Sequence, residues 1–192
     1  MEILVFDMSG VFLNKGMSVF VDSVSEKYNI EKNKIKSFFD GNESSSYRKG
    51  LIKDEDFWKN IEEYLNINAD ELRNLFFTSY EINIETANFI LKLKEKGYKT
   101  GFITNSPGDR FNYLSKKYDF DKYFDIGITS FDSHSWKPEK EIFLKFIKKY
   151  NLDANDITFI DDKESNLFPA KELGIKTIHF KDINSIVHLL DH

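Results

Sequence analysis

The stretch that decides the fold is Ile3-Leu4-Val5-Phe6-Asp7-Met8-Ser9-Gly10-Val11, almost at the start of the chain. Its first four residues are apolar and lack the polar alternation of a strand with one wet face, so they predict a strand covered on both sides. Asp7 follows that strand directly, and Gly10 permits a close approach of the backbone to a ligand. We therefore expect a buried strand that ends in a polar turn facing a ligand.

Four further apolar runs repeat this character, at residues 100–104, 126–129, 157–160 and 177–180. Helical patterns separate the later runs, at residues 85–96 and 139–150, where apolar residues recur on one face. Pro138 suits the first turn of the second helix. The alternation of strand and helix predicts right-handed crossovers and a parallel sheet, which is a Rossmann-like α/β fold.

The segment after the first strand is long and helical in character. Residues 14–83 hold apolar residues at helical spacing, and Asn68 followed by Glu71 is typical of a helix start. Because ligands bind at the carboxyl ends of strands in open α/β sheets, an insertion rooted there would cover the site as a cap. We predict a core of residues 1–13 and 84–192 and a helical cap of residues 14–83. The alternative is that these helices belong to the main layer.

Composition narrows the class of protein. The chain has 192 residues and no cysteine, which indicates one ordinary domain without a disulfide scaffold, a cysteine-ligated metal or a thiol nucleophile, and which fits a cytoplasmic location. A net charge of −5 disfavours nucleic acid as a partner. No apolar run approaches the ~20 residues that cross a membrane. A small-molecule substrate is the expected partner, and both a monomer and a homodimer stay open.

Acidic residues follow two of the predicted strands. Asp7 follows the first, and Asp161 and Asp162 follow the run at residues 157–160. If these strands are neighbours, the three carboxylates share one crevice and repel one another unless a proton or a cation intervenes. Oxygen ligands without histidine or cysteine suit a hard ion, and coordination shared with phosphate suits Mg²⁺. Asp7 alone could be a helix cap or a turn residue, and an Asp-Asp pair alone is common. Only the combination of Asp7 with Asp161 and Asp162 at strand ends indicates a magnesium site.

Donors for an anion follow the other strand ends. Thr104 and Asn105 stand at a strand-to-helix turn, and Lys137 precedes the helix predicted at residues 139–150, whose N-terminal amides also favour anions. Arg48, in the predicted cap, could reach a substrate anion with two parallel hydrogen bonds, and the alternative is a solvated surface arginine. Together these residues indicate a phosphate site.

With these features the chain resembles the haloacid dehalogenase-like (HAD) hydrolase superfamily, in the form with a small helical cap after the first strand. The resemblance covers nearly the whole chain and rests on four motifs in order, at residues 6–11, 103–106, 137–143 and 159–166. It implies that Asp7 is the nucleophile and forms an aspartyl-phosphate. It also implies that Thr104 and Lys137 bind the phosphoryl oxygens and offset charge in the transition state.

The same resemblance implies how Mg²⁺ is held. Its ligands would be Asp7, the backbone carbonyl of Ser9 and Asp162, with Asp161 a direct or water-mediated partner and Asn166 a supporting residue. The resemblance therefore implies a magnesium-dependent phosphatase that acts on a small phosphorylated metabolite.

The chain departs from the family at Ser9. Phosphatases of this superfamily carry a second aspartate there, which protonates the leaving oxygen and then takes a proton from the attacking water. A serine hydroxyl is too weak an acid and base for these steps, and losing such a group typically costs ~10²–10⁴-fold in rate. A phosphatase would need a leaving group that requires little protonation or an acid from elsewhere.

Other functions stay open because of this departure. The chain could be a catalytically weakened protein that binds a phosphoryl ligand. It could hydrolyse 2-haloacids, although dehalogenases of the superfamily need no metal, or phosphonates, which require a cap lysine such as Lys15, Lys49 or Lys53. Receiver domains of response regulators share the Asp, Thr and Lys residues, but their acidic pair precedes the phosphorylated aspartate, which is the reverse of the order here.

Overall fold

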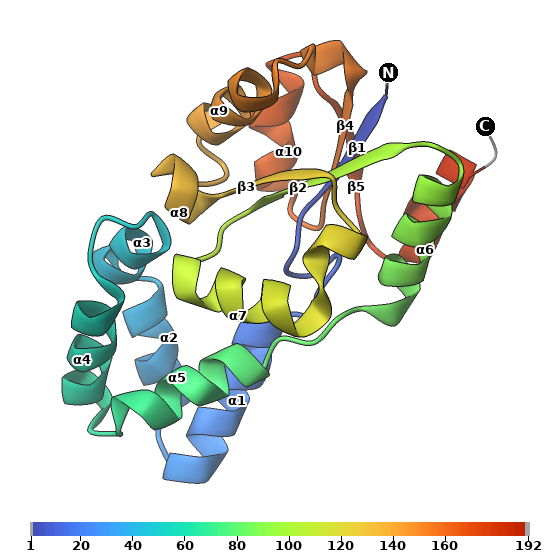
Figure 1. Ribbon diagram of the computed structural model, residues 1–192. Helices are drawn as coiled ribbons and strands as arrows, with labels where there is room; N and C mark the ends of the chain where they lie inside the picture. Colours follow the sequence, from blue (N-terminus) through green and yellow to red (C-terminus); the bar gives the residue numbers. More distant parts are fainter. Residues whose placement is uncertain (1, 191–192) are drawn as a thin grey trace.

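Five parallel strands form the sheet of the computed structural model, which describes residues 2–190 (Figure 1). They are β1 (Ile3–Phe6), β2 (Lys99–Thr104), β3 (Ile126–Thr129), β4 (Ile157–Asp161) and β5 (Lys176–His179). Their spatial order is β3-β2-β1-β4-β5, so the first strand is central and pairs with β2 on one side and β4 on the other. The five predicted strands and the Rossmann-like α/β class are confirmed.

Two long helices cover each face of the sheet (Figure 1). One face carries α6 (Ile84–Glu95) and α7 (Gly108–Tyr118), and the other carries α9 (Lys140–Tyr150) and α10 (Glu164–Lys171). On β1, Leu4 and Phe6 belong to the apolar cluster of the first face, and Ile3 and Val5 belong to that of the second. The strand shows no polar alternation because both of its faces are buried. Burying each such side chain contributes about 1.5–3 kcal/mol.

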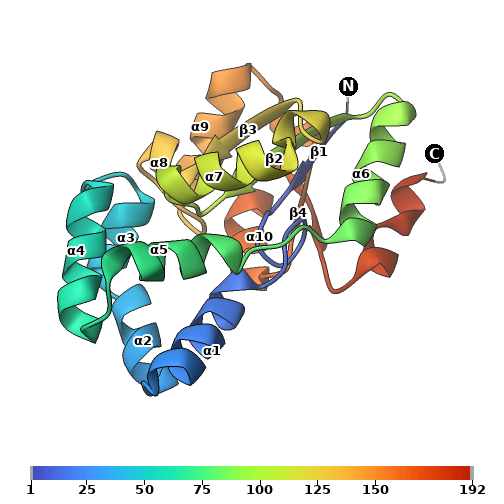
Figure 2. The same cartoon turned by 60° about the horizontal axis from the view of Figure 1, so that its bottom comes forward.

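The helical insertion, the name used below for residues 14–83, lies at one end of the sheet, opposite both chain termini (Figure 2). Its helices are α1 (Gly16–Tyr28), α2 (Lys32–Phe39), α3 (Asn42–Arg48), α4 (Asp54–Leu65) and α5 (Ala69–Thr78). They bury a cluster of aromatic rings. The Phe39 and Phe76 rings stack with centroids 5.4 Å apart, and Tyr47 stacks on Phe57 at 3.9 Å. Aromatic packing therefore stabilises the insertion, and these rings belong to the same apolar cluster as the first face of the sheet.

Two adjacent segments join the insertion to the rest of the chain. Leu13 and Ile82 form an antiparallel bridge, and the Asn14 amide donates to the Glu81 carbonyl at 2.9 Å. The chain thus leaves and re-enters the sheet layer at one place, directly after β1. The division into a core and a cap at these positions stays a prediction.

The loop before α9 differs from expectation. The helix expected over residues 139–150 has Glu139 as its N-cap, so Pro138 lies before the helix rather than in its first turn. The prediction was wrong because the Glu139 carboxylate accepts a hydrogen bond from Ser135 Oγ at 2.9 Å, which closes a turn in front of the helix. The Lys137–Pro138 peptide bond in this turn is cis.

The remaining elements are short. They are α8 (Ser130–Ser133) and 3₁₀ turns at Phe120–Lys122, Ala154–Asp156, Ile183–Ser185 and Val187–Leu190. Within residues 2–190, no helix combines the length and apolar character needed to cross a membrane.

Candidate active site

Three carboxylates meet at the carboxyl edge of the sheet. Asp7 follows β1, Asp161 is the last residue of β4, and Asp162 comes next. The two strands are parallel neighbours, and the Asp7 amide donates to the Ile160 carbonyl at 2.8 Å. One oxygen from each carboxylate lies within 4.8 Å of the others. The register of the sheet thus brings together the acidic residues that were expected to share one crevice.

Lys137 offsets part of this negative charge. Its ammonium lies 2.7 Å from Asp7 Oδ1 and 2.7 Å from Asp161 Oδ2. Burial alone would lower the pKa of Lys137, but the two carboxylates outweigh burial and raise that pKa, so the side chain is an ammonium at neutral pH. Burial raises the pKa of Asp7 to about 6, against the opposing attraction of Lys137. Asp7 is therefore mostly ionised at neutral pH, as a carboxylate nucleophile must be.

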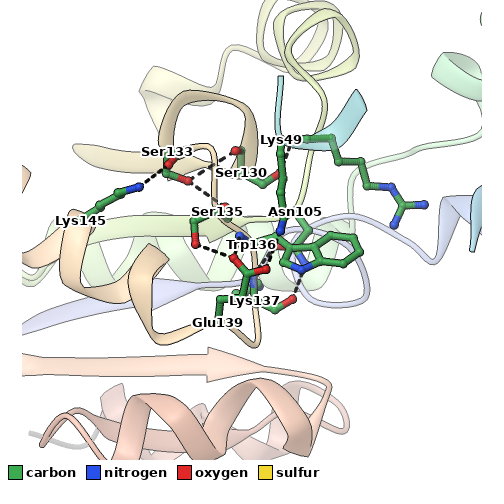
Figure 3. Close-up of polar contacts among 10 residues, drawn as sticks. Lys49, Asn105, Ser130, Ser133, Ser135, Trp136, Lys137, Glu139 and Lys145 are labelled. Atoms are coloured by element: carbon green, nitrogen blue, oxygen red, sulfur yellow. Dashed lines mark hydrogen bonds and ion pairs between the residues drawn. The ribbon is translucent and has the colours of Figure 1, made fainter. Parts of the chain in front are cut away.

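Asn105 holds the backbone of Lys137 in place. Its Nδ2 donates to the Lys137 carbonyl and its Oδ1 accepts from the Lys137 amide, both at 2.8 Å (Figure 3). Both polar groups of the side chain are therefore engaged with protein. These contacts position the lysine, and the expected contact of Asn105 with substrate stays a prediction.

The two aspartates of the acidic pair have different surroundings. Asp161 is fully buried, and its oxygens accept hydrogen bonds from Lys137 at 2.7 Å, from Asn166 at 3.0 Å and from a backbone amide at 2.8 Å. Asp162 Oδ1 is buried with no hydrogen-bond partner among the described residues, and Oδ2 has the exposed Lys15 ammonium at 3.4 Å. Asp161 thus supports Lys137, whereas Asp162 is open to a further ligand.

This arrangement fits a hard divalent cation. A buried carboxylate oxygen without a partner carries a desolvation cost that a cation would remove. The available donors of Asp7 and Asp162 are all oxygens, which suits Mg²⁺. The residues present therefore fit the metal that the sequence led us to expect.

Gly10 makes room for one of these carboxylates. A Cβ at this position would lie 2.5 Å from Asp162 Oδ2, and the φ angle of Gly10 is +95°. A side chain here would therefore meet both a steric clash and backbone strain. The structure shows this close approach of Asp162, and the expected approach of a substrate to Gly10 stays a prediction.

A cavity of about 240 Å³ adjoins the carboxylate–lysine pair. Six of the expected site residues line it, namely Asp7, Ser9, Arg48, Thr104, Asn105 and Lys137. Gly10, Asp161 and Asp162 do not. Phe39 and Tyr80 of the insertion also line it. The volume is below the range typical for drug-sized ligands, so it suits a small metabolite.

Sequence reasoning missed Arg110, which also lines this cavity. The side chain is almost completely buried, and the residue stands in the first turn of α7. A cation at a helix N-terminus opposes the helix dipole, and this mismatch is the signal that could have drawn attention to it. Lys36 and Lys163, two further lining residues, were also missed.

The insertion is tied to the rest of the chain beside the site. The Lys49 ammonium lies 2.5 Å from the Glu139 carboxylate, and Ser130 Oγ donates to the Arg48 carbonyl at 2.7 Å. Lys49, Glu139 and Ser130 are drawn together in Figure 3. On α7, Asp109 accepts hydrogen bonds from side chains of α3 and α4. These contacts hold the insertion over the edge of the sheet where the carboxylates meet.

The fold and the site together define a class of protein. A doubly covered parallel sheet presents a carboxylate–lysine pair to a small cavity, and an acidic group with an unpartnered oxygen lies beside the pair. This arrangement is suited to hydrolysis through a carboxylate. Residues 4–180 match the model of the haloacid dehalogenase-like hydrolases. The chain belongs to this family, which confirms the resemblance found in its motifs.

Phosphatases are among the similar proteins. The phosphorylated carbohydrates phosphatase of Thermotoga maritima is 25% identical over 197 residues, which cover 100% of this chain and 88% of that protein. The glyceraldehyde 3-phosphate phosphatase of Pyrococcus abyssi is 32% identical over 94 residues, which cover 48% of this chain and only 39% of that protein. An HAD family enzyme from Bacteroides thetaiotaomicron, solved with magnesium and inorganic phosphate, is 26% identical with a TM-score of 0.80 over 98% of both chains.

Proposed function

We propose that the chain is a magnesium-dependent phosphatase that acts on a small phosphorylated metabolite through an aspartyl-phosphate at Asp7. One observation carries the proposal: the Asp7 carboxylate is held 2.7 Å from the Lys137 ammonium, beside the unpartnered oxygen of Asp162, at the wall of a small cavity. The phosphatase relatives and the Bacteroides enzyme with bound magnesium and phosphate support the same function. A cytoplasmic location and a capping role for the insertion are parts of this proposal.

Asp7 acts as the nucleophile in the first step. One of its carboxylate oxygens attacks phosphorus, the new O–P bond forms, and the bond from phosphorus to the leaving oxygen breaks. Lys137 and the Thr104 hydroxyl, which line the same cavity, bind the phosphoryl oxygens and offset their charge. In the second step the oxygen of water forms a bond to phosphorus and the bond from phosphorus to Asp7 breaks, which restores the carboxylate. The proton that the water loses leaves with the released phosphate or passes to solvent.

The metal would be held by Asp7, Asp162 and the backbone carbonyl of Ser9. When bound, Mg²⁺ supplies positive charge next to the phosphoryl group and the nucleophile. Asp161 and Asn105 do not contact the reacting atoms in this mechanism. Both position Lys137 so that its ammonium reaches Asp7.

Ser9 shapes which substrates the protein can use. It lines the cavity without a carboxyl group to shuttle protons, so the leaving oxygen must be a weak base or take its proton from water or from another group. Asp40 of the insertion is an acidic side chain on the same cavity. Ser9 is also the observation that favours a second candidate, a catalytically weakened protein that binds phosphoryl ligands without efficient turnover. Hydrolysis of 2-haloacids or phosphonates is a further alternative within the family.

Phosphate release tests the proposal. A panel of phosphate esters and acyl phosphates is incubated with the protein, with Mg²⁺ or with a chelator, and 2-haloacids and phosphonates are included in the same panel. We expect phosphate release that requires Mg²⁺ and disappears in Asp7→Asn, which keeps the size of the side chain. Asp22→Asn, in the exposed part of α1, is the matched control and should retain full activity. Turnover that survives Asp7→Asn would refute the nucleophile. Binding of phosphate without turnover would favour the second candidate.

A further inference from the structure

Two arginines from different elements line the same cavity. Arg48 is the last residue of α3 in the insertion, and Arg110 lies in the first turn of α7 beside the sheet. Both line the cavity that holds Asp7. Arg110 is only 4% exposed, and Arg48 is half-buried. Two guanidinium groups, which are permanently charged, are therefore withdrawn from water next to the proposed nucleophile.

Neither guanidinium has an acidic partner. Arg110 donates from Nε to Ser106 Oγ at 3.2 Å and from a terminal nitrogen to the Asn105 carbonyl at 3.1 Å, and its guanidinium lies 4.4 Å from the Tyr80 ring centroid. Arg48 donates to a backbone carbonyl at 3.0 Å. Among residues 2–190, no carboxylate lies within ion-pair distance of either group. These neutral contacts fix the two side chains, and they leave both guanidiniums without an ion-pair partner among the described residues.

Other buried or half-buried cations of the chain are compensated differently. Lys137 has two carboxylates at 2.7 Å, and Arg73 pairs with Asp109 at 3.2 Å. Burial lowers the pKa of Arg48, and the charge of Arg110 lowers it further, so the two guanidiniums repel each other across the cavity. A pair of unpaired cations at low dielectric is costly unless an anion enters. Asp40 of the insertion lines the same cavity and favours the charged form of Arg48, but it forms no ion pair with either arginine in the described residues.

The phosphoryl group of a substrate does not account for both arginines. In the proposed mechanism that group meets Asp7, Thr104, Lys137 and the metal at the sheet edge. Arg48 belongs to the insertion, which supplies lining residues of the cavity that come from outside the sheet edge. A guanidinium at this position is placed for a group at the other end of a small substrate, and it can bind a carboxylate or phosphate with two parallel hydrogen bonds.

We propose that Arg48 and Arg110 form a second anion subsite, so that the preferred substrate is a small phosphate ester carrying another anionic group, a carboxylate or a second phosphate. The inference rests on the proposed function, because it assumes that the first anionic group is the phosphoryl group at Asp7. It narrows the substrate from any phosphorylated metabolite to bis-anionic ones that fit a cavity of about 240 Å³.

Matched substrates test the subsite. 3-Phosphoglycerate and glycerol 3-phosphate share a three-carbon skeleton and differ by a carboxylate in place of a hydroxymethyl group, and propane-1,3-diol bisphosphate tests a second phosphate. In the wild type, kcat/KM for one of the bis-anionic esters should exceed that for glycerol 3-phosphate about 10- to 100-fold, the worth of a charge-assisted hydrogen-bond pair. Similar kcat/KM values for all three esters would overturn the inference and leave the phosphatase proposal standing.

Variants assign the preference to the arginines. Arg48→Gln should abolish the preference by lowering kcat/KM for the bis-anionic ester alone, and Arg48→Lys should restore part of it. Arg73→Gln is the matched control, since it removes the same charge from the insertion outside the cavity and should keep the preference. If Arg48→Gln slows all three esters equally, Arg48 acts on the phosphoryl group and the second subsite is wrong.

Binding separates this inference from the proposed function. Calorimetry compares the binding of 3-phosphonopropionate with that of propylphosphonate, which lacks the carboxylate. Neither compound is a phosphate ester, so binding is measured without ester hydrolysis. We expect tighter binding of 3-phosphonopropionate by about tenfold or more, lost in Arg48→Gln. If no ester is hydrolysed but this binding preference is found, the anion subsite stands and the phosphatase proposal fails. If neither hydrolysis nor the binding preference is found, both fail.

Discussion

Removing the Asp109 carboxylate should loosen the insertion from the sheet layer. Asp109 lies in the first turn of α7 with its side chain 6% exposed. Three insertion residues converge on it: Tyr47 donates from its hydroxyl at 2.6 Å, Trp58 donates from Nε1 at 3.1 Å, and Arg73 pairs with it at 3.2 Å. Burial, together with the Asp109 charge, raises the pKa of Tyr47 well above its ordinary value, so the hydroxyl remains a donor across the whole neutral range.

The cost of Asp109→Ala follows from these partners. Tyr47 and Trp58 are at most 3% exposed, so each would keep a buried donor without an acceptor, at about 1–3 kcal/mol apiece. The Arg73 side chain is 40% exposed, so its ion pair adds at most about 1 kcal/mol. The free energy of unfolding should therefore fall by about 2–7 kcal/mol. For a chain of this length that corresponds to a Tm lower by about 4–28 °C.

Thermal and urea unfolding measure this effect. Asp109→Asn keeps an acceptor oxygen and should lose about half as much stability as Asp109→Ala. Asp121→Ala, at an exposed position outside the network, is the control and should stay within about 0.5 kcal/mol of wild type. A loss below about 1 kcal/mol for Asp109→Ala would refute the reasoning, because it would mean that the donors find water or other partners without cost.

Three further substitutions probe the site itself. Ser9→Asp should raise kcat on ordinary phosphate esters by about 10- to 100-fold in phosphate-release assays, because it restores a proton shuttle, and an unchanged or lower kcat would argue against that role for position 9. Gly10→Ala should destabilise the fold by about 1–3 kcal/mol in urea unfolding and weaken Mg²⁺ binding in calorimetry, because the new Cβ would lie 2.5 Å from Asp162 Oδ2 and displace that carboxylate. A wild-type affinity for Mg²⁺ would contradict this displacement. Asn105→Ala should lower kcat about tenfold or more at unchanged Mg²⁺ affinity, because the backbone of Lys137 loses both of its contacts with this side chain. A loss of Mg²⁺ binding instead would show that Asn105 acts on the metal site.

The arrangement of the sheet was predictable because its signals are local. A run such as residues 3–6 is apolar at every position since both faces of a parallel strand are covered. Once the strands are parallel, their carboxyl ends share an edge, and Asp7 and Asp161 come together because β1 and β4 are neighbours in that sheet. Lys137 could be added to them because the four motifs resemble those of a known family.

The division of labour inside the site was not predictable in the same way. Whether a carboxylate is taken up by protein donors or left open depends on side-chain directions that tertiary packing sets. Asp161 and Asp162 are adjacent in sequence and have the same side chain. Both oxygens of Asp161 accept hydrogen bonds, whereas Asp162 Oδ1 has no hydrogen-bond partner among the described residues. The roles of Asn105 and Arg110 could not be predicted for the same reason. Asn105 contacts the backbone of Lys137, and Arg110 packs against Tyr80 of the insertion, so both partners are distant in sequence.

A crystal structure with Mg²⁺ and fluoroberyllate, a mimic of the phosphoryl group, tests the central claim most directly. The account predicts beryllium bonded to an Asp7 carboxylate oxygen, fluorides in contact with Lys137 and Thr104, and the metal ligated by Asp7 and Asp162. Beryllium bonded to another residue, or a metal that leaves Asp162 unligated, would contradict it.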